Sequence, residues 1–109
     1  MKRYCFALDL NDDPRLIAEY KDWHTRVSPE IKKSITDAGI TRMDIYTVGN
    51  RMFMIMDTTD DFNFERKEKM DASNPLVQQW ETLMWKYQKP LPFAKPGEKW
   101  MLMEQIFQL

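Results

Sequence analysis

The first ten residues alternate between large apolar side chains and a second set that is small or polar. The large side chains share one parity: Tyr4, Phe6, Leu8 and Leu10. This period of two predicts a β-strand over Lys2–Leu10 with one buried face. Asp9 falls on the other parity, inside an otherwise apolar segment.

Apolar residues at helical spacing follow in two pieces. The first piece starts at Pro14, behind the capping candidates Asn11-Asp12-Asp13, and is predicted to run to about Arg26. The second piece restarts at Ser28-Pro29-Glu30. It is predicted to end at Gly39, because a helix C-terminus favours a residue that adopts a left-handed conformation.

A hairpin and two more helices are predicted next. Thr41–Val48 and Arg51–Thr58 are rich in strand-forming residues, and Gly49-Asn50 between them is typical of a short turn. A short amphipathic stretch follows Asp60-Asp61. A stronger helical pattern then opens at Asn74-Pro75 and continues to Tyr87.

The C-terminal part combines an irregular arm with one more alternating segment. Prolines and a glycine interrupt Lys89–Glu98, and alternation over Lys99–Phe107 predicts the last strand. The element order is therefore strand, helix, strand, strand, helix, strand. This order predicts an α+β, ferredoxin-like split βαβ fold, with helices on one face of a four-stranded antiparallel sheet.

Composition points to one domain and to a partner subunit. A chain of 109 residues is expected to form a single domain (1–109) with one modest core. Its hydrophobic fraction is 43%, and both parities of several strands carry large side chains. The open sheet face is thus expected to pair with a second copy in a dimeric α/β-barrel. Met54→Lys would break that homodimer if Met54 lies on the open face.

Charge and cysteine content disfavour several classes of partner. The chain has 16 basic and 17 acidic residues, so neither nucleic acid nor an anionic membrane is an expected partner. The segment Met1–Leu10 lacks the continuous apolar run of a secretory signal, and a cytoplasmic location is expected. One cysteine, Cys5, and one histidine provide no plausible structural zinc set, so no metal is expected.

Chemistry centres on the single histidine. His24 follows Tyr20 by four residues, which places both side chains on one helix face, one turn apart. An imidazole and a phenol in this arrangement are suited to proton transfer, although a histidine beside a tryptophan is also common as simple packing. Asp9 is a second candidate, because a carboxylate that faces a core must be paired or functional. Alternatively, it is a solvated residue at the end of the strand. Trp80 offers a flat face for a sugar ring.

The same residues resemble the L-rhamnose mutarotase family along nearly the whole chain. The resemblance rests on KRYCFALDL, EYKDWHTRVSPEI, GNRMFMIMDT, NPLVQQWETLM and WMLMEQIF, in that order. It implies a dimeric ferredoxin-like barrel that works without a cofactor and interconverts the α and β anomers of a 6-deoxy-hexose. The sequence has no glycine-rich phosphate-binding loop that would point to a nucleotide cofactor.

The resemblance also implies roles for individual residues. His24 corresponds to the proton donor, and Tyr20 and Trp80 correspond to sugar contacts. Glu81 and Met43 stand where rhamnose enzymes often have Trp and Tyr, so the hydroxyl pattern recognised is expected to differ. The KPGEKW arm is similar to the L-fucose branch of the family.

Three alternatives remain open at this point. The chain could act on L-rhamnose, it could be a cofactor-free monooxygenase-like enzyme on the same barrel, or it could bind ligand without turnover. The second group for proton transfer also stays open among Tyr20, Asp9 and a water molecule.

Overall fold

The computed structural model describes all 109 residues as one antiparallel sheet with four helices. The elements are β1 (Lys2–Leu10), α1 (Pro14–Trp23), α2 (Pro29–Asp37), β2 (Ile40–Val48), β3 (Arg51–Thr58), α3 (Phe64–Ala72), α4 (Pro75–Trp85), β4 (Gln88–Lys89) and β5 (Met101–Leu102). None of the helices has the length and apolar character that crossing a membrane requires.

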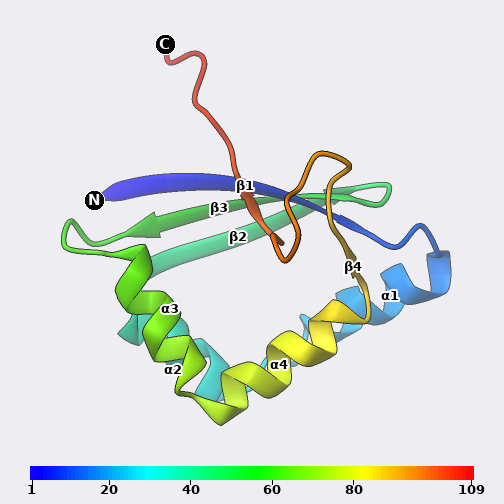
Figure 1. Cartoon of the computed structure of the whole chain (residues 1–109), viewed down its shortest axis with the longest axis horizontal. Coiled ribbons are helices and arrows are strands. Elements are labelled where there is room, and N and C mark those ends of the chain that lie inside the picture. The colour runs from blue at the N-terminus through cyan, green and yellow to red at the C-terminus, as the bar shows by residue number, and fades with distance from the viewer.

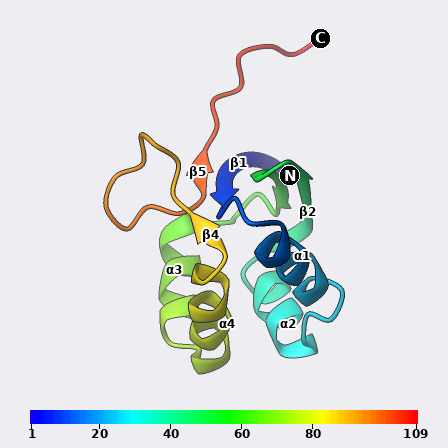
Figure 2. The same ribbon diagram turned by 90° about the vertical axis from the view of Figure 1, so that its right-hand side faces the viewer.

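The sheet has the order β2-β3-β1-β4, and β5 pairs with β1 as well. All helices lie on one face of the sheet (Figures 1 and 2). On this face, α1 and α2 form one pair, and α3 and α4 form a second pair next to it. This is the expected split βαβ arrangement, and the predicted ferredoxin-like α+β fold is confirmed.

The start of α1 is encoded by its capping residues, and its end differs from the prediction. The Asp13 carboxylate accepts hydrogen bonds from the backbone N–H groups of Arg15 at 2.9 Å and Leu16 at 3.4 Å. The α-helix ends at Trp23 rather than at Arg26. Between these residues the N–H groups bond to carbonyls three positions back, which tightens the last turn.

Gly39 ends the second helical piece as predicted. Its φ is +97°, in the region that glycine adopts most readily. A Cβ at this position would lie 2.9 Å from Thr59 Oγ1. The turn therefore brings the α2–β2 connection against the end of β3.

The register of the central strands decides which side chains face the helices. Phe6 lies opposite Met54, and Leu8 lies opposite Met52, so these four residues share a face. All of them are buried, with Leu8 fully so. Met54 thus faces the helices, and the idea that it could contact a partner subunit was wrong, because the parity of a strand alone does not say which face is covered.

The side chains at the alternate positions of the strands lie on the open face of the sheet. Two cross-strand ion pairs frame it, Arg51 with Asp9 and Arg3 with Asp57. Between them lies a half-buried apolar strip, defined here as Cys5, Ala7, Phe53 and Ile55.

The predicted last strand over Lys99–Phe107 was wrong in its extent. Two short segments share the edge of β1 instead: β4 pairs with its end, and β5 pairs with its middle. After the bond from Met103 N–H to the Cys5 carbonyl, at 2.7 Å, the tail 104–109 leaves the sheet (Figures 1 and 2). Alternation favours a strand only where a neighbouring strand offers hydrogen bonds, and none is available to this tail within the chain.

Candidate active site

A cavity of about 590 Å³ lies between the covered face of the sheet and the helices. Its walls come from β1, β2 and β3, from all four helices, from β4 and from the arm before β5. The lining is mainly apolar, with a few polar groups among the hydrophobic side chains. Cavities of this size and character are typical of sites for small organic ligands.

His24 lies at the end of α1, where the tightened turn controls its side chain. Its backbone N–H bonds to the Lys21 carbonyl, which leaves the Tyr20 carbonyl free of that bond. The imidazole Nδ1 lies 2.7 Å from this Tyr20 oxygen. A carbonyl only accepts, so Nδ1 carries a proton in this contact, and Nε2 makes no hydrogen bond within the protein. His24 lines the cavity and is half-buried.

Tyr20 is the buried neighbour of His24. The two ring centroids are 4.5 Å apart, and only 3% of Tyr20 is exposed. Gln88 Nε2 donates a hydrogen bond to the Tyr20 hydroxyl oxygen at 3.1 Å. Burial raises the pKa of the Tyr20 hydroxyl above its ordinary range, and the bond from Gln88 partly opposes this shift. Tyr20 therefore stays protonated at neutral pH.

The aromatic wall continues onto α4. The Trp80 ring stands edge-on to the imidazole of His24, with centroids 5.6 Å apart. Trp100, from the arm before β5, lines the same cavity and packs against the core. Aromatic faces of this kind suit the C–H-rich side of a sugar ring.

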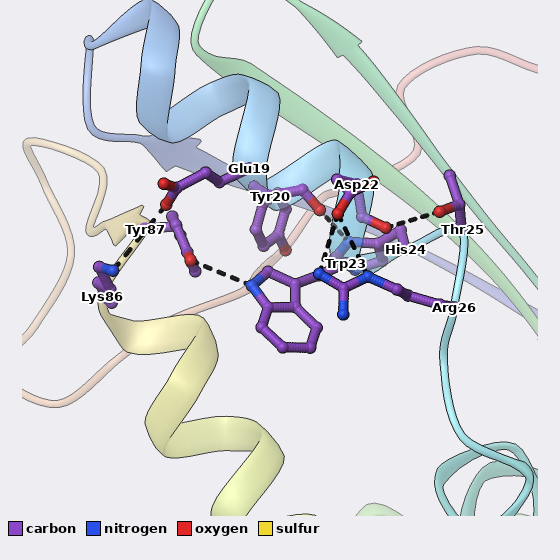
Figure 3. A network of polar contacts seen from close by, with 9 residues as sticks. All are labelled: Glu19, Tyr20, Asp22, Trp23, His24, Thr25, Arg26, Lys86 and Tyr87. Atoms are coloured by element: carbon purple, nitrogen blue, oxygen red, sulfur yellow. Dashed lines mark hydrogen bonds and ion pairs between the residues drawn. The ribbon is translucent and has the colours of Figure 1, made fainter.

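A polar network outside the cavity fixes α1 against the end of α4 (Figure 3). Trp23 Nε1 donates to the Tyr87 hydroxyl at 3.1 Å, and Arg26 lies 4.0 Å from the centroid of the Trp23 ring. Lys86 and Glu19 add an ion pair at 3.9 Å. These contacts hold the helix end that carries His24 in a defined position relative to β4.

Two charged groups lie where the cavity meets the arm. Glu81 and Lys99 both line it. Burial lowers the pKa of the Lys99 ammonium, and the charge of Glu81 acts in the opposite direction. Lys99 Nζ also lies 4.4 Å from the centroid of the Trp85 ring. A polar ligand can thus meet both an acceptor and a donor here.

The cavity brings together five of the six residues that the sequence singled out. His24, Tyr20, Trp80, Glu81 and Met43 line it. Asp9 does not: it lies on the open face, where Arg51 donates to both of its carboxylate oxygens at 2.8 and 3.1 Å. We therefore leave Asp9 out of the site, because a cross-strand guanidinium accounts for its burial.

Sequence reasoning missed the polar residues that the long-range pairing brings in. Gln88, Lys67, Asp71 and Lys99 line the cavity, and Lys67 pairs with Asp71 along α3. The i, i+4 spacing of Lys67 and Asp71 is visible in the sequence, but it is common on exposed helices. Gln88 had no local signal, since β4 is only two residues long.

These features define a small α+β protein with a candidate acid–base site in an aromatic-lined cavity. No group of three or more His, Cys, Asp or Glu side chains is arranged to hold a metal ion. The groups in the cavity are an imidazole with one nitrogen that bonds to no protein atom, a protonated phenol, a carboxamide and the charged side chains of Glu81 and Lys99. They are suited to moving protons on an uncharged polar ligand.

Comparisons with known proteins agree with this class. The sequence profile of the L-rhamnose mutarotase family matches residues 3–109. The L-fucose mutarotase of Xanthomonas campestris pv. campestris is 44% identical, over 100% of this chain and 89% of its own length. The L-rhamnose mutarotase of Phocaeicola vulgatus is 32% identical, over 88% of this chain and 85% of its own length.

A solved structure supports the fold. The crystal structure of an L-rhamnose mutarotase from Formosa agariphila superposes with a TM-score of 0.73 at 21% identity, and the match covers 100% of this chain and 99% of that one. The chain belongs to the L-rhamnose mutarotase family. It is a sugar mutarotase, an isomerase of the carbohydrate epimerase type.

Proposed function

We propose that this mutarotase acts on a 6-deoxy-hexose, that it prefers L-fucose to L-rhamnose, and that His24 moves the proton. One observation carries the catalytic role. The bond between Nδ1 and the Tyr20 carbonyl, at 2.7 Å, keeps a proton on Nδ1, so Nε2 is the nitrogen that exchanges a proton with the sugar. His24 is the only histidine of the chain, and it lines the cavity.

Mutarotation needs one proton to change place. The bond between C1 and the ring oxygen breaks, the anomeric hydroxyl loses its proton as the C1 carbonyl forms, and the ring oxygen takes up a proton. After rotation about C1–C2 the ring oxygen attacks the other carbonyl face, and the proton moves back. His24 Nε2 accepts the anomeric proton and His24 returns a proton to the ring oxygen, so no electrons are gained or lost.

Tyr20 acts in this scheme as a hydrogen-bond donor to the sugar. Its pKa is raised by burial, so the hydroxyl keeps its proton throughout the reaction. Its oxygen already accepts from Gln88, which leaves the proton free to donate to a sugar oxygen. Trp80, beside His24, stacks on the apolar side of the ring.

The preference for L-fucose rests on the similarity to the Xanthomonas enzyme and on two cavity residues. Glu81 supplies a carboxylate that accepts hydrogen bonds from hydroxyl groups, and Met43 is an adaptable apolar contact. L-Fucose and L-rhamnose differ in the orientation of their ring hydroxyls. A charged acceptor at one wall of an apolar cavity can distinguish such orientations.

Saturation-transfer NMR of anomer exchange tests the substrate preference directly. The wild type is expected to accelerate exchange of L-fucose more than exchange of L-rhamnose and of other deoxy-hexoses. Equal or faster exchange of L-rhamnose would overturn the preference while leaving the mutarotase activity in place. Equilibrium binding of both sugars without any faster exchange would overturn the proposed catalytic site.

A substitution within the cavity sharpens this test. Glu81→Trp should lower the ratio of L-fucose to L-rhamnose exchange rates by about tenfold, since it exchanges an acceptor for an apolar face. Thr82→Trp is the matched control, because Thr82 is the exposed next residue on α4 and does not line the cavity. It should leave the ratio unchanged.

We also infer that two copies pair through the open face of the sheet to form the dimeric barrel. Two features support this proposal. The apolar strip on that face is covered by no helix, and the tail beyond β5 exposes Ile106 and Phe107 by 89% and 76%. Large apolar surfaces without cover favour association. Light scattering should give twice the mass of the chain, and a monodisperse monomer at micromolar concentration would contradict the barrel.

A further inference from the structure

One polar atom in the core of the molecule has no partner. Gln88 is 6% exposed, and its Oε1 accepts no hydrogen bond from the protein. The same side chain lines the cavity that holds His24. A buried carboxamide oxygen without a donor is rare in folded proteins, because it has lost water and gained nothing in return.

The other end of the carboxamide is firmly held. Nε2 donates to the Tyr20 hydroxyl at 3.1 Å, and this bond is itself buried. The main chain is fixed as well: β4 pairs with β1 at Leu10, and the carbonyl of the preceding Tyr87 accepts from Asn11 N–H at 2.8 Å. The unpaired oxygen therefore occupies a fixed place, and Gln88 cannot simply turn it toward solvent.

Tyr20 and Gln88 together present a complementary pair of groups. The Tyr20 hydroxyl accepts from Gln88 and donates to no protein atom, so its proton is free. Gln88 Oε1 is a free acceptor beside it. A single hydroxyl group can both accept and donate, and it satisfies both groups at once. Three hydrogen bonds then form a closed ring that connects Tyr20, Gln88 and the ligand hydroxyl, and each bond strengthens the next.

We propose that Gln88 is a specificity-determining residue of the mutarotase, whose Oε1 accepts a hydrogen bond from one ring hydroxyl of the sugar while Tyr20 donates to the same hydroxyl. The proposal rests on the proposed function, because it assumes a sugar in this cavity. It adds a residue that recognises one hydroxyl and leaves the proton transfer to His24. A sugar without that hydroxyl leaves both groups unpaired and binds more weakly.

Calorimetric titration with L-fucose, L-rhamnose and their monodeoxy derivatives tests the assignment. The wild type should bind one monodeoxy derivative at least about tenfold more weakly than its parent sugar. In Gln88→Met, which keeps the length of the side chain without its polar atoms, the parent should bind about tenfold more weakly. The difference between parent and that derivative should then become smaller, because only the bond from Tyr20 to that hydroxyl remains. Gln79→Met, at an exposed position of α4, is the matched control and should retain the wild-type difference.

Thermal unfolding without sugar separates recognition from a purely structural role. Loss of the bond to Tyr20 is offset by removal of the unpaired oxygen, so Gln88→Met should melt close to the wild type. A lower melting temperature together with an unchanged preference for the parent sugar would overturn the proposal. So would a wild type that binds every monodeoxy derivative as tightly as its parent, a result that does not depend on the variant. If the wild type accelerates anomer exchange of neither sugar, the proposed function fails instead.

Discussion

The two faces of the sheet differ in how the buried polar groups beside them are hydrogen-bonded. On the open face, Asp9 and Asp57 are buried to more than nine tenths, and each accepts two hydrogen bonds from an arginine of a neighbouring strand. In the cavity between the other face and the helices, His24 Nε2, the proton of Tyr20 and Gln88 Oε1 have no protein partner. The buried carboxylates of the open face thus have their hydrogen bonds within the protein, whereas the cavity keeps polar atoms without a protein partner.

A buried polar residue indicates a site only when the protein leaves its hydrogen bonding incomplete. Asp9 interrupts an apolar strand, yet the guanidinium of Arg51 pairs with its charge. Gln88 has no distinctive sequence pattern around it, and its Oε1 is the buried atom without a hydrogen-bond partner. A functional site is indicated by groups that the fold positions without satisfying them, because the ligand then completes the bonding.

The largest effect on activity is expected in the cavity, at His24. His24→Gln should lower the rate of anomer exchange by about 10²-fold or more, because glutamine does not titrate and cannot shuttle a proton. Saturation-transfer NMR on the folded protein measures it. Lys21→Gln, exposed on the same helix, is the control and should keep the wild-type rate. If His24 served only in packing, His24→Gln would change the melting temperature and leave turnover near wild type.

Much of the fold can be predicted from local sequence, while the distribution of polar groups over the two faces cannot. Asp13, Ser28 and Asn74 cap their helices, and Gly39 ends one, each through contacts within a few residues. The partner of Asp9 lies 42 residues away, so register decides its role. The same holds for Gln88, which meets Tyr20 across 68 residues.

A smaller effect is expected from a charge on the apolar strip of the open face. Ile55 lies opposite Cys5 and Asp44, so a lysine there finds a carboxylate nearby and the protomer should stay folded. In a dimer the same ammonium would be buried against the partner copy. Ile55→Lys should therefore weaken dimerisation by at least about tenfold, measured by analytical ultracentrifugation.

The control for this dimer test lies on the same face. Val48 is 78% exposed at the hairpin end, and Val48→Lys should leave the dimer intact. If both variants are dimers with wild-type affinity, the two copies do not meet through the apolar strip.

A still smaller effect on activity is expected at Asp9. Asp9→Asn keeps the shape of the side chain and part of its bonding to Arg51, and it lies away from the cavity. The rate of anomer exchange per folded protein should stay within about twofold of the wild type. A fall comparable to that of His24→Gln would return Asp9 to the list of candidates for the second proton group.

The smallest effect depends on pH and concerns the pair of Arg3 and Asp57. The hydrogen bond from Arg3 lowers the pKa of the Asp57 carboxyl, with burial acting against it and the charges of Arg3 and Arg42 adding to it. A carboxyl whose pKa is lower in the folded state stabilises the fold at pH values above its ordinary pKa, and it loses that contribution as the pH falls through its pKa in the folded protein.

Arg3→Met should therefore lower the melting temperature slightly at pH 7, since Arg3 is 56% exposed and solvent screens the pair. The difference from the wild type should shrink as the pH falls below about 4 and vanish below the lowered pKa of the Asp57 carboxyl, where this group is protonated in both proteins. Arg15→Met, which removes an exposed guanidinium without an ion-pair partner, is the control for loss of a guanidinium and should cost little at neutral pH. A difference for Arg3→Met that stays constant from pH 7 to pH 3 would mean that the arginine stabilises the strand through packing of its alkyl chain rather than through the charge of Asp57.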